Sequence, residues 1–356
     1  MGNSPDPSSL ADVDLPKLIF GSGSLGNLYK AASDAEKLEC IESWFQSSAL
    51  PLVIDSAGKY GAGMALSVLG RHLESLGIDP SDVIINNKLG WRQTPLEGPE
   101  PTFEPGVWFD IEHDAVQDIS ASGIRRCFEQ GEELLGKFGS RLLSVHDPDE
   151  FLVDGPPEER DRRLADVLAA YEELRTIQSE RGLLGVGVGA KDWRVIAEID
   201  SHIKLDWAMF ANSWTILDHP AELSAVFDDL QKRGVVVFNS AVLHGGFLSG
   251  GQFIDYQKVD PSNPSHAVKI EKRDRLRAIC EQHGVSVFHA AVQFGLCHPA
   301  IQSVALSSTK PERTKSMVAA VNEPLPGEFW GALQGAGVIE PRDEITNWLV
   351  QNKRES

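Results

Sequence analysis

The sequence predicts a (β/α)8 (TIM) barrel, an α/β fold in which eight parallel strands alternate with helices. Two observations lead to this fold class. Eight short apolar segments are each followed by a stretch with helical periodicity, and no change of composition along the 356 residues marks a boundary between domains. Alternating strand–helix units predict a parallel sheet, and eight of them in one chain of this length are typical of a closed barrel. A doubly wound open sheet is the alternative, but it seldom needs eight strands.

The predicted strands are short runs rich in Val, Ile and Leu, as expected for strands buried on both faces. They cover residues 17–21, 51–55, 83–88, 141–146, 184–188, 205–210, 235–239 and 301–306. The predicted helices have apolar residues three and four positions apart. They cover residues 34–48, 63–76, 120–136, 158–181, 192–202, 220–233, 266–283, 286–297 and 310–320, with one or two more within 325–349.

We expect the barrel to occupy residues 15–349 as one catalytic domain, after a disordered lead of residues 1–14 and before a tail of residues 350–356. Two inserts interrupt the alternation. Residues 90–113 contain four prolines, and residues 240–265 are rich in Gly, Ser and Pro. Because proline removes backbone donors, we expect both inserts to be irregular loops, at the carboxyl ends of strands where barrel active sites lie.

Charge and composition exclude several classes of protein. The formal net charge of −19 argues against a surface for nucleic acid or anionic lipid, because both require clustered Lys and Arg. No apolar run approaches the ~20 residues of a membrane span, and the N-terminus does not resemble a secretion signal. The four cysteines are scattered, without metal-site spacing. We expect a cytoplasmic protein, a monomer or small homo-oligomer, that binds small molecules and no metal.

The first predicted strand runs into Gly21-Ser22-Gly23-Ser24-Leu25-Gly26, which matches the G-x-G-x-x-G pattern of dinucleotide-binding folds. That fingerprint normally opens directly into a helix, with an acidic residue about 20 positions later. Here the helical pattern begins only near Ser33, and Asp55 follows later still. We therefore interpret these glycines as a tight turn, or as a place where the backbone approaches a ligand.

Four reactive side chains follow successive predicted strands. Asp55 ends the second strand, Tyr60 lies in the loop after it, Lys88 ends the third and His146 ends the fourth. Each alone is readily explained as a helix cap, a loop aromatic or a solvated charge. Together, in one barrel, they predict an acid/base centre, since an ammonium favours phenolate, an aspartate keeps the lysine charged and an imidazole orients an oxygen. Such a centre can move a proton to or from an oxygen whose carbon gains or loses hydride. No side chain can carry the hydride, so this chemistry needs a bound hydride carrier.

Asp55-x4-Tyr60-Gly61, Lys88-Leu89-Gly90 and Val145-His146-Asp147 resemble the active-site motifs of the aldo-keto reductases, over nearly the whole chain. The resemblance implies a nicotinamide cofactor bound in an extended form on a barrel. It implies that Tyr60 is the general acid/base, that Asp55 and Lys88 tune it, and that His146 orients the substrate oxygen.

Three further stretches resemble one branch of that family. They are Val145-His146-Asp147-Pro148, Gly185-Val186-Gly187-Val188 and Trp214-Thr215-Ile216-Leu217-Asp218. The branch contains L-fucose, L-galactose and D-threo-aldose dehydrogenases and pyridoxal dehydrogenases, which oxidise a hemiacetal or alcohol with NAD. The resemblance therefore implies a sugar or another aldehyde or alcohol as substrate, and we expect Trp91 and Trp214 to contact it.

The resemblance also implies which residues hold the cofactor. They are Gly23, Ser24, Leu25, Asp55, Gly189, Asn239, Ser240, Leu243, Ser307, Lys310 and Arg313. Two positions depart from the family pattern. Gly189-Ala190 replaces the asparagine that holds the carboxamide, which leaves Asn212, Asn239 or the backbone for that task. Ser240 replaces the tyrosine that stacks on the nicotinamide, which leaves Trp214 or Phe238 to cover the ring.

Cofactor choice depends on the residues near a 2′-phosphate. Arg313 occupies a family position for that phosphate, but neutral Ser307 stands near the place of the family's lysine, and Lys310 is the nearest replacement. We expect NAD, with NADP as the alternative. The leading function is an aldose 1-dehydrogenase. The alternatives are an NADPH-dependent aldehyde or ketone reductase, a cofactor-binding regulatory subunit on the same fold, and a barrel hydrolase that uses Asp55 and His146.

Overall fold

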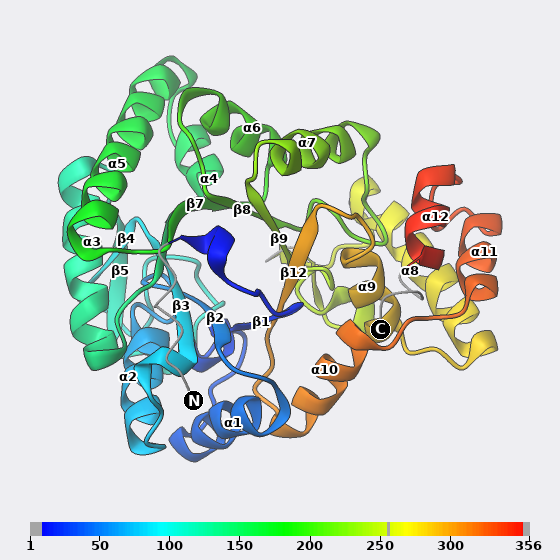
Figure 1. Cartoon of the computed structure of the whole chain (residues 1–356), viewed down its shortest axis with the longest axis horizontal. Helices are drawn as coiled ribbons and strands as arrows, with labels where there is room; N and C mark the ends of the chain where they lie inside the picture. The colour runs from blue at the N-terminus through cyan, green and yellow to red at the C-terminus, as the bar shows by residue number, and fades with distance from the viewer. Residues whose placement is uncertain (1–8, 255–256, 352–356) are drawn as a thin grey trace.

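The computed structural model describes residues 9–254 and 257–351, and eight parallel strands within them close into a barrel (Figure 1). The strands, in their order around the barrel, are β1 (Leu18–Gly21), β12 (Ile301–Leu306), β9 (Val236–Ser240), β8 (Trp207–Ala211), β7 (Gly185–Ala190), β6 (Leu142–His146), β3 (Val83–Leu89) and β2 (Leu52–Ala57). The predicted fold class is confirmed, because β1 pairs with both β2 and β12 and so leaves no open edge. Each predicted strand overlaps an observed one.

Helices surround the barrel at the places where the sequence predicts them, except for the short helix α4 at Pro148–Val153, which was not predicted. They are α1 (Asp34–Ser47), α2 (Met64–Ser75), α3 (Ala121–Leu135), α4 (Pro148–Val153), α5 (Arg160–Arg181), α6 (Trp193–His202), α7 (Ala221–Lys232), α8 (Pro264–His283), α9 (Val287–Gly295), α10 (Thr314–Asn322), α11 (Gly327–Gly335) and α12 (Asp343–Gln351). Ser33 caps α1, since its Oγ accepts a hydrogen bond from the Glu36 backbone while the Glu36 carboxylate accepts one from the Ser33 backbone.

Alternate residues of each strand point into the barrel. Large apolar side chains fill the half of its interior that lies toward the amino ends of the strands. Ile19, Val53, Ile84, Trp207 and Phe238 form this interior cluster together with Leu142 and Met209. Trp207 needs the space beside β7, where a Cβ on Gly187 would overlap the indole ring. The inward parity continues up the strands to Asp55, Lys88, His146 and Gly189 at their carboxyl ends.

The lead of residues 1–14 was expected to be disordered, and the structure differs for its described part. Residues 1–8 lie outside the described residues, but Leu10–Asp12 form a turn of 3₁₀ helix, η1. The Leu10 side chain is buried against the interior cluster, and its backbone N–H donates to the Leu184 carbonyl. Burial of one leucine therefore orders the chain before the first strand and closes the amino end of the barrel. At the other end of the chain, residues 352–356 of the expected tail lie outside the described residues.

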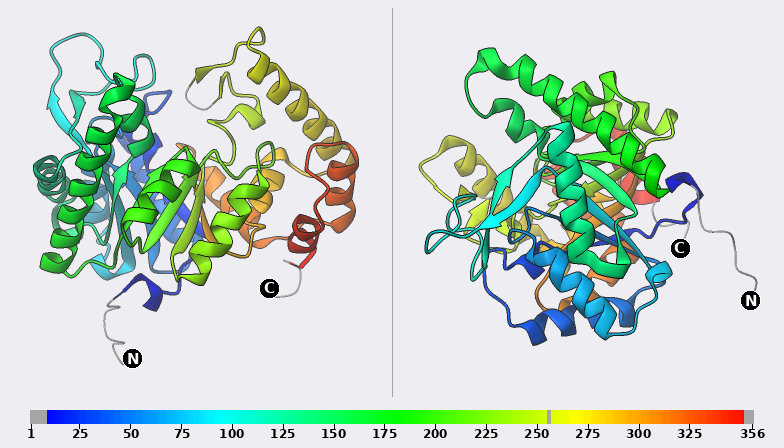
Figure 2. Two further views of the ribbon diagram at one scale, coloured as in Figure 1. Left: turned by 90° about the horizontal axis from the view of Figure 1, so that it is seen from above. Right: turned by 90° about the vertical axis from the view of Figure 1, so that its left-hand side faces the viewer.

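Both inserts lie at the end of the barrel opposite η1 (Figure 2, left). The first is more regular than predicted, because β4 (Trp91–Pro95) and β5 (His113–Gln117) pair as an antiparallel hairpin. Its prolines are confined to the last residue of β4 and the connection beyond it, the positions where a strand tolerates proline. In the second insert, β10 (Phe253–Ile254) and β11 (Gln257–Lys258) form a short ribbon. Among the described helices, none has the length and apolar character of a membrane span.

Candidate active site

The carboxyl ends of β2, β3 and β6 bring the four predicted catalytic residues together. In the sheet register Asp55 lies opposite Asn86, Ala57 opposite Lys88, and His146 opposite Gly189. Tyr60 follows β2 in a tight turn, in which its N–H donates to the Ala57 carbonyl at 3.1 Å. Pairing of parallel strands thus places residues from distant parts of the sequence around one point.

Asp55 and Lys88 form a buried ion pair at the floor of this site. Lys88 Nζ lies 2.5 Å from Asp55 Oδ2, and Asn86 Nδ2 donates to Asp55 Oδ1 at 2.8 Å. The Lys88 side chain is only 4% exposed and that of Asp55 only 6%, which leaves both charges dependent on these partners. A buried pair of this kind holds its two groups in fixed positions, because separating them would leave an uncompensated charge.

Tyr60 lies between Lys88 and His146. Its ring centre is 4.8 Å from Lys88 Nζ, and the His146 ring meets it edge-on at 5.5 Å between centroids. Burial, followed by the carboxylates of Asp55 and Asp147, raises the pKa of Tyr60 well above its ordinary value. The sequence-based expectation of a lowered phenol pKa is therefore not met, because these effects outweigh the opposing ammonium of Lys59. Tyr60 keeps its proton and is prepared to act as an acid.

His146 is a neutral imidazole. Burial lowers the pKa of His146 well below its ordinary value. Its Nδ1 is buried without a hydrogen-bond partner among the described residues, and its Nε2 lies 3.6 Å from Asp147 Oδ2. An uncharged ring with unused hydrogen-bonding capacity can hold a substrate oxygen beside Tyr60.

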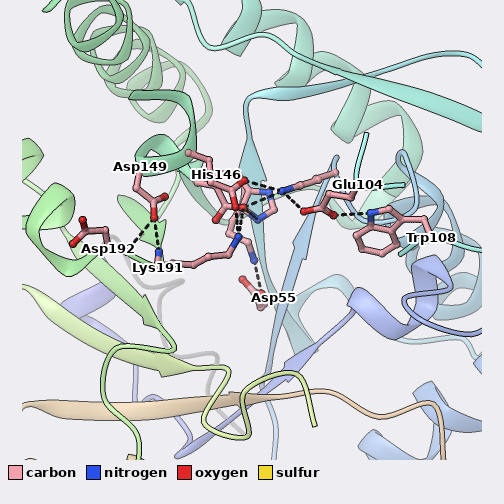
Figure 3. Close-up of polar contacts among 11 residues, drawn as sticks. Asp55, Glu104, Trp108, His146, Asp149, Lys191 and Asp192 are labelled. Atoms are coloured by element: carbon pink, nitrogen blue, oxygen red, sulfur yellow. Dashed lines mark hydrogen bonds and ion pairs between the residues drawn. The ribbon is translucent and has the colours of Figure 1, made fainter. Parts of the chain in front are cut away.

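An ion cluster next to the tetrad was not predicted from the sequence. Lys59 is 2% exposed, and its Nζ lies 2.7 Å from Glu104 Oε1 and 3.1 Å from Asp147 Oδ2. Lys191 pairs with Asp147 at 3.6 Å and with Glu150. Figure 3 shows Glu104 and Trp108 on one side of His146 and Lys191 on the other. The available signal was the proximity of Lys59 to Tyr60 and of Asp147 to His146 in the sequence.

Aromatic side chains from the first insert form one wall of the site. The ring centroids of Tyr60 and Trp108 are 6.0 Å apart, those of Trp108 and Phe103 are 6.1 Å apart, and those of Phe103 and Trp91 are 5.8 Å apart. Trp91, which we predicted to contact the substrate, is half-buried and lies 4.9 Å from Lys59 Nζ. The structure therefore places Trp91 beside Lys59 and Phe103, whereas the ring in contact with Tyr60 is that of Trp108.

Trp214, the second predicted substrate contact, lies elsewhere. It has no exposed surface, and its ring packs against Phe227, Phe294 and His298 outside the barrel wall. The prediction that Trp214 contacts the substrate is therefore wrong. A tryptophan in the core between strands and helices buries more apolar area than one at the polar opening of the barrel, which explains its position.

The glycine turn and the end of β12 meet beside the tetrad. Ser307 Oγ donates to Ser24 Oγ at 3.0 Å, and the Ser22 N–H donates to the Asp55 carbonyl at 2.9 Å. A Cβ on Gly23 would lie 4.0 Å from the Tyr60 ring. Leu25 is buried in the core instead of facing this space. Lys310 and Arg313 are exposed next to Ser307, around the 3₁₀ turn η7 (Pro311–Arg313).

The other predicted cofactor contacts differ in whether their strand position points into the barrel or out of it. Gly189 points inward, where its missing side chain leaves room for Lys88, and Ser240 also has inward parity. Asn239 points outward and is fully buried, and its Nδ2 donates to the carbonyls of Trp214 and Gly295. The structure therefore does not bring Asn239 to the site. Leu243 is half-buried and packs against the two outer core clusters.

Asn212, the alternative carboxamide holder, has the opposite character. Its Oδ1 is buried and without a hydrogen-bond partner among the described residues. Asn212 lines an open pocket of about 580 Å³ together with Asp149 and Lys191. A buried acceptor without a donor is destabilising unless a ligand or water supplies one, so Asn212 fits a ligand amide better than Asn239 does.

Gly26 controls how closely the glycine turn approaches Tyr60. A Cβ at Gly26 would lie 2.7 Å from the Tyr60 carbonyl carbon and 2.8 Å from the Gly61 nitrogen, both of which are backbone atoms. We expect Gly26→Ala to lower the free energy of unfolding by about 1–3 kcal/mol. It should also lower kcat, because displacement of an acid/base group by about 1 Å costs up to 10²-fold. Urea denaturation and steady-state kinetics measure both effects.

Gly331 provides the matched control for that substitution. It lies in helix α11, and a Cβ there meets no atom within 4 Å. Gly331→Ala should leave kcat unchanged and leave stability equal or slightly higher. If Gly26→Ala behaves like Gly331→Ala in both measurements, the close approach does not position Tyr60.

Comparison with known proteins agrees with this geometry. The sequence profile of the aldo/keto reductase family matches residues 17–337. The chain belongs to the aldo/keto reductase family. It is 27% identical over 333 residues to a pyridoxal 4-dehydrogenase of Microbacterium luteolum, which covers 90% of this chain and 94% of that protein. It is 25% identical over 345 residues to a D-threo-aldose 1-dehydrogenase of Pseudomonas sp, covering 95% and 99% of the two chains.

The fold is also found in solved structures. The structure of a glycerol dehydrogenase from Gluconobacter oxydans matches with a TM-score of 0.66 at 19% identity and covers 93% of this chain and 95% of that one. The predicted family and its aldose and pyridoxal dehydrogenase branch are confirmed. This aldo/keto reductase is accordingly an NAD(P)-dependent oxidoreductase, and a small carbonyl compound is the type of substrate that fits its family.

Proposed function

We propose that this aldo/keto reductase is an NAD-dependent dehydrogenase of uncharged sugars or similar aldehydes and alcohols, with aldose 1-dehydrogenation as its leading activity. The observation that carries the proposal is the arrangement of Tyr60 between the Lys88–Asp55 pair and the neutral imidazole of His146. The activities of the two curated relatives, on pyridoxal and on a D-threo-aldose, support the substrate class.

The residues present fit a nicotinamide cofactor. The buried Oδ1 of Asn212 needs a donor such as a carboxamide, the Ser24–Ser307 pair offers hydroxyl groups, and exposed Arg313 offers a cation for the nucleotide end. We assign NAD because Ser307 is neutral, whereas a 2′-phosphate would favour two cations. When bound, a nicotinamide supplies the hydride acceptor of the oxidation, or the hydride donor of the reverse reaction.

The chain's own residues would handle the proton. In the oxidation, the deprotonated form of Tyr60 would take the proton of the substrate hydroxyl, and His146 would hold the oxygen. The hydrogen on the carbon that bears this hydroxyl would leave with its bonding pair as hydride. In the reverse direction Tyr60 returns the proton to the carbonyl oxygen. Because the pKa of Tyr60 is raised, the oxidative rate should increase with pH, whereas the reductive rate should stay constant until Tyr60 ionises.

The charges around the site favour an uncharged substrate. The ammonium groups of Lys59, Lys88 and Lys191 all pair with carboxylates. The carboxylates are those of Asp55, Glu104, Asp147 and Glu150, so four negative charges face three positive ones. A phosphate or carboxylate on the substrate would meet no uncompensated cation among these groups. The aromatic wall offers instead a flat apolar face, on which the C–H face of a sugar or a pyridine ring can stack.

A matched pair of substrates tests this proposal. We expect kcat/KM for pyridoxal and for neutral aldoses such as L-fucose and L-galactose to exceed that for pyridoxal 5′-phosphate and galactose 6-phosphate by at least about tenfold, the equivalent of ~1.4 kcal/mol. Initial rates with NAD and NADP, followed at 340 nm, provide the measurement. A preference for phosphorylated substrates would contradict the substrate class. Faster turnover of simple aldehydes with NADPH would favour the reductase alternative, and tight cofactor binding without turnover would favour a regulatory subunit.

A further inference from the structure

Lys59 is a buried ammonium that joins three separate parts of the chain. It follows β2 in the loop that carries Tyr60. Its Nζ contacts Glu104 of the first insert at 2.7 Å, and Asp147 and Glu150, which follow β6, at 3.1 and 3.3 Å. Its Nζ also lies 4.9 Å from the centre of the Trp91 ring. An ammonium has three protons, and here three carboxylates surround it.

The cost of burying this ammonium makes the three contacts interdependent. Burial alone would lower the pKa of Lys59, but the carboxylates of Asp147, Glu104 and Glu150 raise it well above its ordinary value, so the group stays charged. A buried charge that loses a partner leaves the remaining charges unbalanced. The position of Glu104 is therefore tied to the position of Lys59, and through it to the turn after His146.

Glu104 extends the link to the aromatic wall. Its Oε2 accepts a hydrogen bond from Trp108 Nε1 at 2.8 Å, and the Trp108 ring lies 6.0 Å from the Tyr60 ring. Tyr60 in turn follows Lys59 directly in the chain. The contacts therefore run from Lys59 to Glu104, from Glu104 to Trp108 and from Trp108 to Tyr60, and the peptide bond between residues 59 and 60 joins the two ends. One carboxylate thus fixes both the Lys59 ammonium and the indole that lies beside the acid/base group.

We propose that Lys59 is a positioning residue that holds residues 96–112, the part of the first insert between β4 and β5, against the Tyr60 loop. We propose further that Glu104 transmits this position to Trp108 on the substrate side of the site. The inference rests on the proposed function for the identity of that side. Lys59 touches no reacting atom in this assignment. Its role is to place the aromatic wall at the distance from Tyr60 that a bound substrate requires.

The insert has other attachments, so the variants that test this role should fold. Phe103, Val107, Trp108 and Ile111 pack in an apolar cluster with Ala62. The backbone of the insert also pairs with the glycine-turn region, where the Tyr29 N–H donates to the Val107 carbonyl at 2.8 Å and the Phe109 N–H donates to the Asn27 carbonyl at 3.2 Å. Loss of Glu104 should therefore loosen the wall without detaching the insert.

The test compares Glu104→Ala with Glu100→Ala in the full chain. Glu100 is an exposed residue of the same insert. We expect Glu104→Ala to raise KM for the best substrate by about 10- to 100-fold, as for loss of a hydrogen bond to a charged group, with a smaller change in kcat. The Kd for the cofactor should stay within about twofold of the wild-type value. Glu100→Ala should match the wild type in all three quantities.

Substitutions at Lys59 separate a positioning role from general stabilisation. Lys59→Met should raise KM as Glu104→Ala does, and combining the two should add little, because they break the same link. Lys59→Arg keeps the positive charge, so its KM should lie close to the wild-type value. A purely structural role predicts instead additive losses, equal changes in kcat and KM, and no recovery by arginine, and that result would overturn the inference.

Hydrogen exchange of residues 96–112, followed by mass spectrometry, provides a readout that needs no substrate. Exchange should be faster in Glu104→Ala and Lys59→Met than in the wild type and Glu100→Ala. If the wild type turns over no substrate but exchange responds as expected, the proposed function fails and the link stands. If the wild type is active, while both exchange and KM in Glu104→Ala equal those in Glu100→Ala, the link fails and the proposed function stands.

Discussion

Replacing Tyr60 by Phe should lower kcat by about 10²- to 10⁴-fold, the range that a positioned general acid or base contributes. Phenylalanine keeps the ring that packs between Lys88 Nζ and the edge of His146, and removes only the hydroxyl group. The cofactor Kd should therefore remain within about twofold of the wild-type value. Steady-state rates and titration of cofactor fluorescence measure the two quantities separately.

The pH profile distinguishes loss of the proton acceptor from a misplaced ring. Wild-type kcat/KM for the oxidation should rise with pH, because the pKa of Tyr60 is raised and its deprotonated form has to accept the proton. Residual activity of Tyr60→Phe should lack this rise. Tyr171→Phe is the control, because Tyr171 is a buried tyrosine of helix α5 that packs in the outer core. Near wild-type kcat in Tyr60→Phe would exclude Tyr60 as the acid/base.

Lys88→Met should lower the free energy of unfolding by about 3–5 kcal/mol, because it leaves the Asp55 carboxylate buried without its cation. Asn86 would remain as a hydrogen-bond donor at 2.8 Å but would not neutralise the charge. The same substitution should lower kcat by about 10²-fold or more, since it removes the charge next to the Tyr60 ring. Urea denaturation and initial rates measure these effects.

A double substitution separates the two roles of this ion pair. Asp55→Asn together with Lys88→Met removes both charges, while the amide oxygen introduced at position 55 can still accept from Asn86, so the double variant should be more stable than Lys88→Met alone. Its activity should not recover. Arg71→Met provides the control, because its ion pair with Asp34 is exposed and should contribute less than about 1 kcal/mol. Equal losses of stability at Arg71 and Lys88 would contradict the importance of burial.

The barrel was predictable because its signal is local. Each strand is a short apolar run, and in β2 and β3 all residues are buried, as expected for strands covered on both faces. The tetrad was predictable for a related reason. Once the strands are parallel, Asp55, Lys88 and His146 must share the carboxyl end of the barrel. Strand ends, in contrast, differ from prediction by one or two residues, since apolar periodicity fades where the strands meet polar turns.

Long-range contacts account for what the sequence analysis missed. Lys59 stands between Gly58 and Tyr60 in a polar loop and there resembles a solvated charge, yet its partner Asp147 is 88 residues away in the sequence. The β4–β5 hairpin has little alternation of apolar and polar residues, and only pairing in space defines it. Asn239 and Ser240 are neighbours in sequence but face opposite sides of the barrel wall, because successive strand residues alternate in direction. Only the register of the strand shows which of the two points inward.

The contact between Gly187 and Trp207 has a consequence for the history of this chain. The indole occupies the volume that a side chain at position 187 would require, so the two positions share one space across adjacent strands. A side chain can arise at position 187 only after Trp207 has become smaller, because the opposite order passes through an overfilled barrel. The order of these two substitutions in any lineage is thereby restricted, even though neither residue takes part in the chemistry.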